Sequence, residues 1–228
     1  MPDSPGLIVT VERHDTDQLL LTDIDGCWPR ALTIDTIGDH WDARPSPDGK
    51  SIVYTLRRFD DLNRLDVVLL KIETGKSITL YGKSSTRALS PKRSPDGRWI
   101  AFIAQETERD EIYLVRPNGQ GLHQLANTGH HVAQFEWSPS SQQLAVIFNR
   151  NGAFDLSLLE VETGAIVDIR SGQGIHSSSN WSTDGTFITF EYAKICGMLM
   201  SAWNNSWIGI SYRDNHGNQN SKRRINRC

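Results

Sequence analysis

Histidine is the residue type in this chain best suited to chemistry, and its spacing argues against a metal-binding role. His40 and His176 each precede a serine by six residues, and His131 precedes one by seven. A zinc site needs three or four ligands that converge at suitable spacing. These histidines instead recur at one place in a repeating pattern, which favours a structural role.

Serine and glycine patterns for catalysis and cofactor binding are incomplete. A nucleophilic serine of the hydrolase type needs Gly-x-Ser-x-Gly, which does not occur, and the nearest sequence, Gly209-Ile210-Ser211-Tyr212-Arg213, lacks the second glycine. Gly172-Gln173-Gly174 begins like a dinucleotide fingerprint, but Ser177 replaces the third glycine and a strand follows where a helix is needed. We therefore expect no catalytic residue, no cofactor and no metal in this chain.

The composition is that of an ordinary globular protein. The 228 residues include 24 Lys and Arg against 27 Asp and Glu, and the formal net charge is −3. This balance gives no electrostatic reason to expect a nucleic acid or an anionic membrane as a partner. Cys27, Cys196 and Cys228 are odd in number and widely spaced, which predicts neither a disulfide framework nor a zinc site.

The N-terminal segment lacks the features of an export signal. Residues 1–6 carry no basic side chain, and the apolar run from Leu7 to Val11 is too short for a signal-peptide core. The weakly polar stretch from Ile195 to Trp203 is less than half as long as a membrane span. We therefore expect a cytoplasmic protein without a membrane segment.

A repeated turn organises the chain. Its serines, spaced by 48, 44 and 44 residues, belong to the turns Ser46-Pro47-Asp48-Gly49, Ser94-Pro95-Asp96-Gly97, Ser138-Pro139 and Ser182 with Asp184 and Gly185. An Asp before Gly in such a turn bonds to its own backbone, so we interpret these residues as structural.

Short runs of β-branched and aromatic residues follow each turn. Ile52-Val53-Tyr54 and Val67–Leu70 are two such runs in one repeat, and a second turn at Gly75 closes the hairpin after them. Each repeat predicts four short antiparallel strands, one before the Ser-Pro-Asp-Gly turn and three after it. That is the size of a β-propeller blade.

Partial repeats flank the complete ones. Leu19–Thr22 and Arg30–Thr33 predict the last two strands of a blade, and Phe187–Phe190 predicts an early strand of another, after which we expect the next two strands to be absent. The fold expected over residues 1–192 is all-β, an incomplete β-propeller of four-stranded antiparallel blades with three full blades and two partial ones.

Residues 193–228 differ from the repeats in composition. They carry six Lys or Arg against one Asp, and they hold six of the twelve Asn. We expect this non-repeat basic tail to be a disordered extension or the product of a shifted reading frame. A two-nucleotide shift at Ala193 permits a strand that begins Glu-Asp-Leu-Trp, which favours the frameshift; nucleotides that disallow this string would exclude it.

The repeats resemble those of two protein groups. Ser94-Pro95-Asp96-Gly97, followed by Ile100-Ala101-Phe102, Ile112–Val115 and Asn118-Gly119, is similar to repeats of the TolB-like periplasmic propellers and of the N-terminal propeller in the prolyl oligopeptidase family of serine peptidases. The resemblance covers residues 18 to 192. It implies that a histidine at the place of His40 ties one blade to the next.

Blades that begin close to residue 1, with no export signal or preceding α/β domain, favour the peptidase group. This resemblance implies the noncatalytic propeller portion of a serine peptidase, truncated before the α/β-hydrolase domain. That domain would be its partner in the intact enzyme, where the propeller would gate peptide access. The alternative is a stand-alone TolB-like module that binds a protein or peptide.

Two charged loops are the candidate binding sites. Loops at the margin of a propeller blade carry function more often than its strands do. The loops contain Arg57, Arg58, Asp60 and Asp61 in one repeat, and Glu108, Arg109 and Asp110 in the next. We expect a peptide or protein to bind at this loop face.

Overall fold

The computed structural model describes residues 6–13, 15–34, 36–106, 108–150, 153–170, 175–192 and 195–200. Among them, no helix is long and apolar enough to cross a membrane. The chain divides into two units, the first made of residues 1–108 and 112–124 and the second of residues 109–111 and 125–228. Each unit is described by itself.

The first unit begins with a three-stranded antiparallel sheet. Its strands pair in the order β1 (Gly6–Arg13), β2 (Thr16–Asp23), β3 (Arg30–Ala31). The sequence predicted only β2 and β3, and this prediction was wrong about β1. The Gly6–Arg13 segment has the β-branched composition of a strand, but no complete Ser-Pro-Asp-Gly turn precedes it to mark it as part of a repeat.

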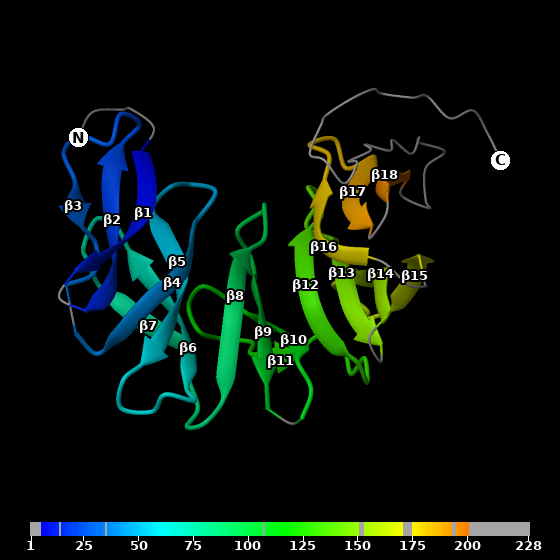
Figure 1. Ribbon diagram of the computed structural model, residues 1–228, viewed down its shortest axis with the longest axis horizontal. Helices are drawn as coiled ribbons and strands as arrows, with labels where there is room; N and C mark the ends of the chain where they lie inside the picture. The colour runs from blue at the N-terminus through cyan, green and yellow to red at the C-terminus, as the bar shows by residue number, and fades with distance from the viewer. Residues whose placement is uncertain are drawn as a thin grey trace. The chain divides into compact units, whose positions relative to one another are not determined.

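Two four-strand repeats follow in the first unit (Figure 1). The first contains β4 (Gly38–Pro45), β5 (Ser51–Arg58), β6 (Leu65–Lys71) and β7 (Ser77–Tyr81). The second contains β8 (Arg87–Arg93), β9 (Ile100–Gln105), β10 (Glu111–Val115) and β11 (His123–Gln124). Neighbouring strands within each repeat are antiparallel, and one parallel pairing of Leu65 with Arg87 joins the two repeats.

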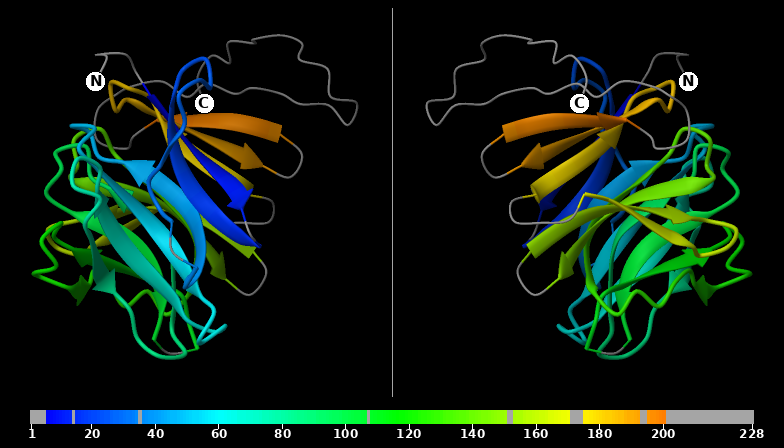
Figure 2. Two further views of the ribbon diagram at one scale, coloured as in Figure 1. Left: turned by 90° about the vertical axis from the view of Figure 1, so that its left-hand side faces the viewer. Right: turned by 90° about the vertical axis from the view of Figure 1, so that its right-hand side faces the viewer.

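The second unit contains a four-stranded and a three-stranded sheet, seen from the side in Figure 2. The first sheet has β12 (His131–Trp137), β13 (Gln143–Arg150), β14 (Ala153–Glu160) and β15 (Ile166–Arg170). The second has β16 (Ile175–Trp181), β17 (Phe187–Tyr192) and β18 (Ile195–Met200). The described residues thus form an all-β fold with three four-stranded repeats and two three-stranded ones, which confirms the predicted fold class.

β18 corrects the expectation that no strand follows Phe190. It pairs antiparallel with β17, from Ile195 opposite Tyr192 to Met200 opposite Phe187. Main-chain groups form such a ladder whatever the side chains are, so the unusual composition of this segment misled the prediction. Residues 201–228 lie outside the described residues, and the disordered or frameshifted tail stays a prediction.

The strand after each Ser-Pro-Asp-Gly turn is the most deeply buried of its repeat. Ile52, Ile100 and Leu144, which begin these strands, have no exposed surface. Each such aliphatic side chain contributes about 1.5–3 kcal/mol when it leaves water. One apolar cluster of the first unit joins its two four-strand repeats and contains Val53, Val67, Leu69, Leu80, Tyr81, Ala88, Ile100, Phe102, Ala104, Tyr113 and Val115.

Candidate binding loops

The Ser-Pro-Asp-Gly residues form turns that are hydrogen-bonded internally. Ser46 Oγ donates to Asp48 Oδ1 at 2.5 Å and accepts from the Ser51 N–H at 3.0 Å. The Lys50 N–H donates to the same carboxylate oxygen at 3.1 Å, and Gly49 has φ +66°. The same bonds recur at Ser94 with Asp96 and Gly97, and at Ser182 with Asp184 and Gly185, while Pro47, Pro95 and Pro139 are exposed.

These bonds stabilise the ionised carboxylates of the turns. The Ser46 hydroxyl, followed by the Lys50 N–H, holds the pKa of Asp48 below its ordinary value. The Ser182 hydroxyl and Thr186 lower the pKa of Asp184 to about 2. Both carboxylates are committed to their own turns.

The third repeat replaces Asp-Gly with Ser140-Ser141 and keeps the same turn. Ser138 Oγ lies 3.0 Å from Ser140 Oγ, and Ser141 has φ +62° at the glycine position. A residue with a Cβ costs about 1–2 kcal/mol in this left-handed region. The turn therefore holds its shape even where the sequence opposes it.

Two of the three repeat histidines bond back to the preceding repeat, as their predicted structural role requires. His40 is fully buried, and its Nδ1 lies 2.8 Å from the carbonyl oxygen of Asp17. His131 Nδ1 lies 3.0 Å from Asp110 Oδ2. The side chain of His176 lies outside the described residues, as do the candidates Gly172, Gly174 and Ser211.

The charges of the β5–β6 loop, residues 59–64, and of the end of β5 are mostly paired. Arg57 Nη1 lies 3.4 Å from Asp39 Oδ2, and the guanidinium lies over the Trp41 ring. Arg58 makes a bidentate pair with Asp60 at 3.0 and 2.9 Å. This pair holds the pKa of Asp60 below its ordinary value.

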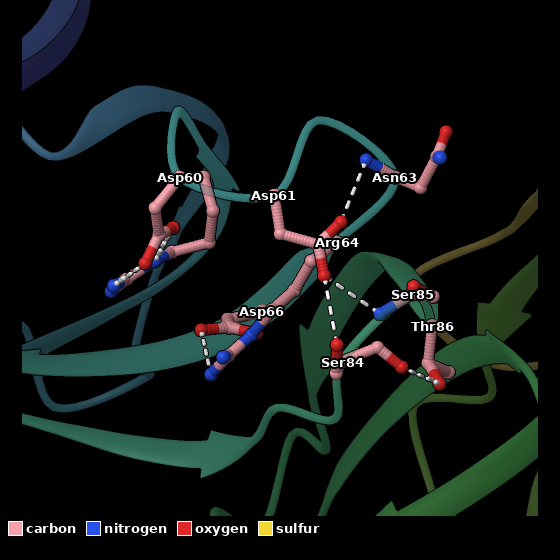
Figure 3. A network of polar contacts seen from close by, with 9 residues as sticks. Asp60, Asp61, Asn63, Arg64, Asp66, Ser84, Ser85 and Thr86 are labelled. Atoms are coloured by element: carbon pink, nitrogen blue, oxygen red, sulfur yellow. Dashed lines mark hydrogen bonds and ion pairs between the residues drawn. The ribbon is translucent and has the colours of Figure 1, made fainter.

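Asp61 ties this loop to the connection before β8 (Figure 3). Its Oδ2 accepts from the Ser85 N–H at 2.8 Å and from Ser84 Oγ at 3.1 Å. Its Oδ1 accepts from the Asn63 N–H at 3.2 Å. The Ser85 N–H is the main reason that the pKa of Asp61 lies below its ordinary value.

Arg64 and Asp66 support the loop from beneath (Figure 3). The guanidinium bonds to both carboxylate oxygens at 2.7 and 2.9 Å, and the Asp66 side chain is only 1% exposed. A Cβ added at Gly82 would lie 2.6 Å from Asp66 Oδ1, so glycine is required there. The pair and the glycine together fix the start of β6 against the next repeat.

The counterpart loop after β9 is braced in the same manner. Glu106 Oε1 accepts from the Tyr81 hydroxyl at 2.8 Å and from Lys83 Nζ at 2.5 Å. Lys83 is the main reason that the pKa of Glu106 is lowered, while burial and then Glu106 raise that of Tyr81. Glu108 is exposed. In the second unit Arg109 is exposed and Asp110 bonds to His131.

Sequence reasoning missed a buried acid that recurs at the start of the third strand of each full repeat. Asp66, Glu111 and Asp155 are 1%, 6% and 4% exposed. Glu111 accepts from the N–H and hydroxyl of Thr128, and Asp155 pairs with Arg150 at 3.2 Å. A constant distance of eight or nine residues to the next hairpin glycine is the signal that would have found them.

Sequence reasoning also missed the apolar part of the loop surface. Phe59 is 41% exposed and Leu62 is 64% exposed, both within the β5–β6 loop. Ile37, whose carbonyl accepts the Phe59 N–H at 3.0 Å, is 46% exposed. A rigid loop with exposed apolar side chains between ion pairs has the composition of a protein-binding surface, in which apolar residues supply affinity and a polar rim supplies specificity.

The arrangement supports noncovalent binding. Within the described residues, no three His, Cys, Asp or Glu side chains are close enough to hold a metal ion. The hydroxyls of Ser84 and Thr86 bond to Asp61 and to the Ser84 carbonyl, so neither is paired with a general base.

Comparisons with known proteins agree with this architecture. The chain is 30% identical over 176 residues to the uncharacterized protein Atu1656 of Agrobacterium fabrum, covering 70% of this chain and 56% of that protein. It is 25% identical over 139 residues to dipeptidyl-peptidase 5 of Porphyromonas gingivalis, covering 56% of this chain and 20% of the peptidase. The structure of a putative TolB from Agrobacterium tumefaciens superposes with a TM-score of 0.63 at 26% identity, over 82% of this chain and 69% of that one.

The chain spans about half or less of the length of these two curated relatives. The family model described as the TolB beta propeller domain, PD40, matches residues 63–198, which is more than half of the chain and includes β18. The repeated turns, the four-stranded repeats and this match lead to one conclusion: the chain belongs to the TolB β-propeller family.

Proposed function

We propose that this chain is a noncatalytic propeller that binds a polypeptide segment, and that it is the propeller portion of a prolyl-oligopeptidase-type serine peptidase. In such an enzyme it would pack against an α/β-hydrolase domain and gate the access of peptides to the active site. The sequence contains no Gly-x-Ser-x-Gly elbow, so the proposal assigns this chain a binding role.

The observation that carries the binding role is the exposed apolar surface of the braced β5–β6 loop. Phe59 and Leu62 stay exposed while the Asp61 bonds to Ser84 and Ser85 hold the loop. A loop that is already ordered loses little entropy on binding, so more of the contact energy contributes to affinity. An extended peptide suits this surface because its backbone can bond to the polar rim while its apolar side chains contact Phe59 and Leu62.

The peptidase assignment is supported by the extent of the similarity. The match to dipeptidyl-peptidase 5 covers only 20% of that protein, a stretch of propeller repeats. Sequencing the gene beyond the codon for Phe190 tests the assignment. Further Ser-Pro-Asp-Gly repeats followed by Gly-x-Ser-x-Gly with later Asp and His would support it, and an unrelated gene after a genuine stop codon would refute it.

The noncatalytic role has a direct test. The purified chain is incubated with aminoacyl and acyl-aminoacyl chromogenic substrates, and we expect no hydrolysis above that of a heat-denatured sample. Hydrolysis that copurifies with the chain through two separations would overturn the proposal.

A second candidate function is a stand-alone polypeptide-binding module of the TolB type. The 30% identity to Atu1656, which extends over 56% of that protein, favours it because that match covers a larger share of the relative than the peptidase match does. The same gene sequence separates the two candidates.

A further inference from the structure

The open edge of β1 distinguishes its sheet from the others in the described residues. β5, β9 and β13 each lie between two strands, whereas β1 is the terminal strand of the order β1-β2-β3. Ile8 corresponds to Ile52, because each pairs with a leucine five residues before a hairpin glycine. On this alignment Val11 corresponds to Thr55, and the two are 36% and 1% exposed. β1 therefore lacks the strand cover that its counterparts have.

β1 also lacks the features that usually protect a sheet edge. Short length, bulges, proline and central lysines all discourage pairing with another chain. β3 and β11 have two residues each, and β4 has a register shift between Trp41 and Arg44. β1 pairs with β2 over eight residues without a shift, contains no proline or lysine, and carries its charges only at Glu12 and Arg13.

The main chain of β1 has a defined set of groups at the open edge. β1 and β2 are joined by a two-residue loop, so the flanking pair Arg13 and Thr16 is hydrogen-bonded, and the pattern then alternates along the hairpin. Odd-numbered residues of β1 bond to β2. The N–H and C=O groups of Ile8, Thr10 and Glu12 point to the open edge.

The side chains of β1 are self-complementary. Leu7, Val9 and Val11 share one face of the strand, and Leu7 is 46% exposed. Antiparallel pairing with a second copy, with Val9 opposite Val9 of that copy, places Leu7 opposite Val11 and Ile8 opposite Thr10. Glu12 then lies opposite Gly6, so no like charges face each other.

We propose that β1 is a self-association surface, where two copies of this chain join by antiparallel β1 pairing around a twofold axis at Val9. The pairs at Ile8 and Thr10 exchange main-chain hydrogen bonds. Leu7, Val9 and Val11 of both copies form one apolar stripe through non-hydrogen-bonded pairs, whose side chains lie closest together. The result is a continuous six-stranded sheet across the dimer.

Sedimentation of the full chain tests the association, and we expect a reversible dimer. Val9→Lys places two ammonium groups opposite each other and should give a monomer with unchanged circular dichroism. Ile78→Lys is the matched control, since Ile78 lies on terminal strand β7 and is 42% exposed, and it should leave the dimer intact. A monomeric parent chain, or a dimer that survives Val9→Lys, would overturn the proposal.

Disulfide trapping tests the register. In a background where Cys27, Cys196 and Cys228 are replaced by serine, Val9→Cys should form a disulfide-linked dimer on mild oxidation, because non-hydrogen-bonded pairs have Cα atoms about 4.5 Å apart. Thr10→Cys should remain monomeric under reducing-agent-free electrophoresis, since Thr10 faces Ile8 of the other copy. Linkage at Thr10 without linkage at Val9 would refute the twofold at Val9.

Discussion

Asp61 Oδ2 accepts the N–H of Ser85 at 2.8 Å, and this bond joins the β5–β6 loop to the connection that leads into β8. Removing the carboxylate should loosen the loop and lower the urea midpoint of the first unit. We expect Asp61→Ala to show this loss and faster amide exchange at Ser85. Asp60→Ala, in the same loop but paired only with exposed Arg58, is the control and should leave both unchanged. Equal midpoints for the two variants would contradict the bracing role.

The Arg64–Asp66 pair should matter more than the Arg58–Asp60 pair, because Asp66 is 1% exposed. Truncating Arg64 leaves a buried carboxylate without its partner. Since Arg64 itself is partly exposed, we expect Arg64→Ala to cost about 2–3 kcal/mol of unfolding free energy. Arg58→Ala should have no measurable effect in the same urea titration. A cost for Arg64→Ala as small as that for Arg58→Ala would show that water satisfies Asp66.

The repeated turns give a test of backbone conformation alone. No atom lies within 4 Å of a Cβ added at Gly49, whose φ is +66°, so Gly49→Ala should cost about 1–2 kcal/mol through the backbone only. Ser141 already occupies that conformation, at φ +62°. Ser141→Gly should therefore be neutral or stabilising in thermal unfolding. A large loss from Ser141→Gly would show that its side chain outweighs the strain.

Acid should weaken the turn of the fourth Ser-Pro-Asp-Gly-type motif. The pKa of Asp184 is about 2 in the folded chain and 3.8 in its ordinary state. A lowered folded pKa means that its contribution is present above pH 3.8 and is lost as the pH falls from there through about 2. NMR titration of the Asp184 carboxylate should show this pKa, and Asp184→Asn should remove that part of the acid dependence. A midpoint near 3.8 would contradict the bonds to Ser182 and Thr186.

The repeat turns could be predicted from sequence because their chemistry is local. Ser46 and Asp48 are two residues apart and bond to each other and to their own backbone, so the spacing alone identifies the turn. The same locality explains why the three full repeats could be counted. β1 and β18 were missed because a strand at the margin of a sheet needs only main-chain pairing, and neither follows a complete turn motif.

The loop surface could be predicted only in part. The sequence identified Arg58, Asp60 and Asp61 by their charge, but their partners at Ser84 and Ser85 lie about two dozen residues away and depend on the fold. Exposure is likewise set by neighbours distant in sequence, so Phe59 was indistinguishable from a core aromatic. Asp66 was hidden for the opposite reason, because an acid at a strand start usually lies in water.

The most direct test of the central claim is the binding of unfolded polypeptide to the β5–β6 loop. Short peptides that tile reduced, carboxymethylated lysozyme are immobilised and probed with the purified chain. We predict binding to peptides with apolar residues, weakened at least about tenfold by Phe59→Ala or Leu62→Ala without loss of stability. Trp28→Ala is the control, since Trp28 is 88% exposed in the β2–β3 turn, and it should bind as the parent does. Binding that Trp28→Ala abolishes and Phe59→Ala leaves unchanged would contradict the account, as would no binding at all.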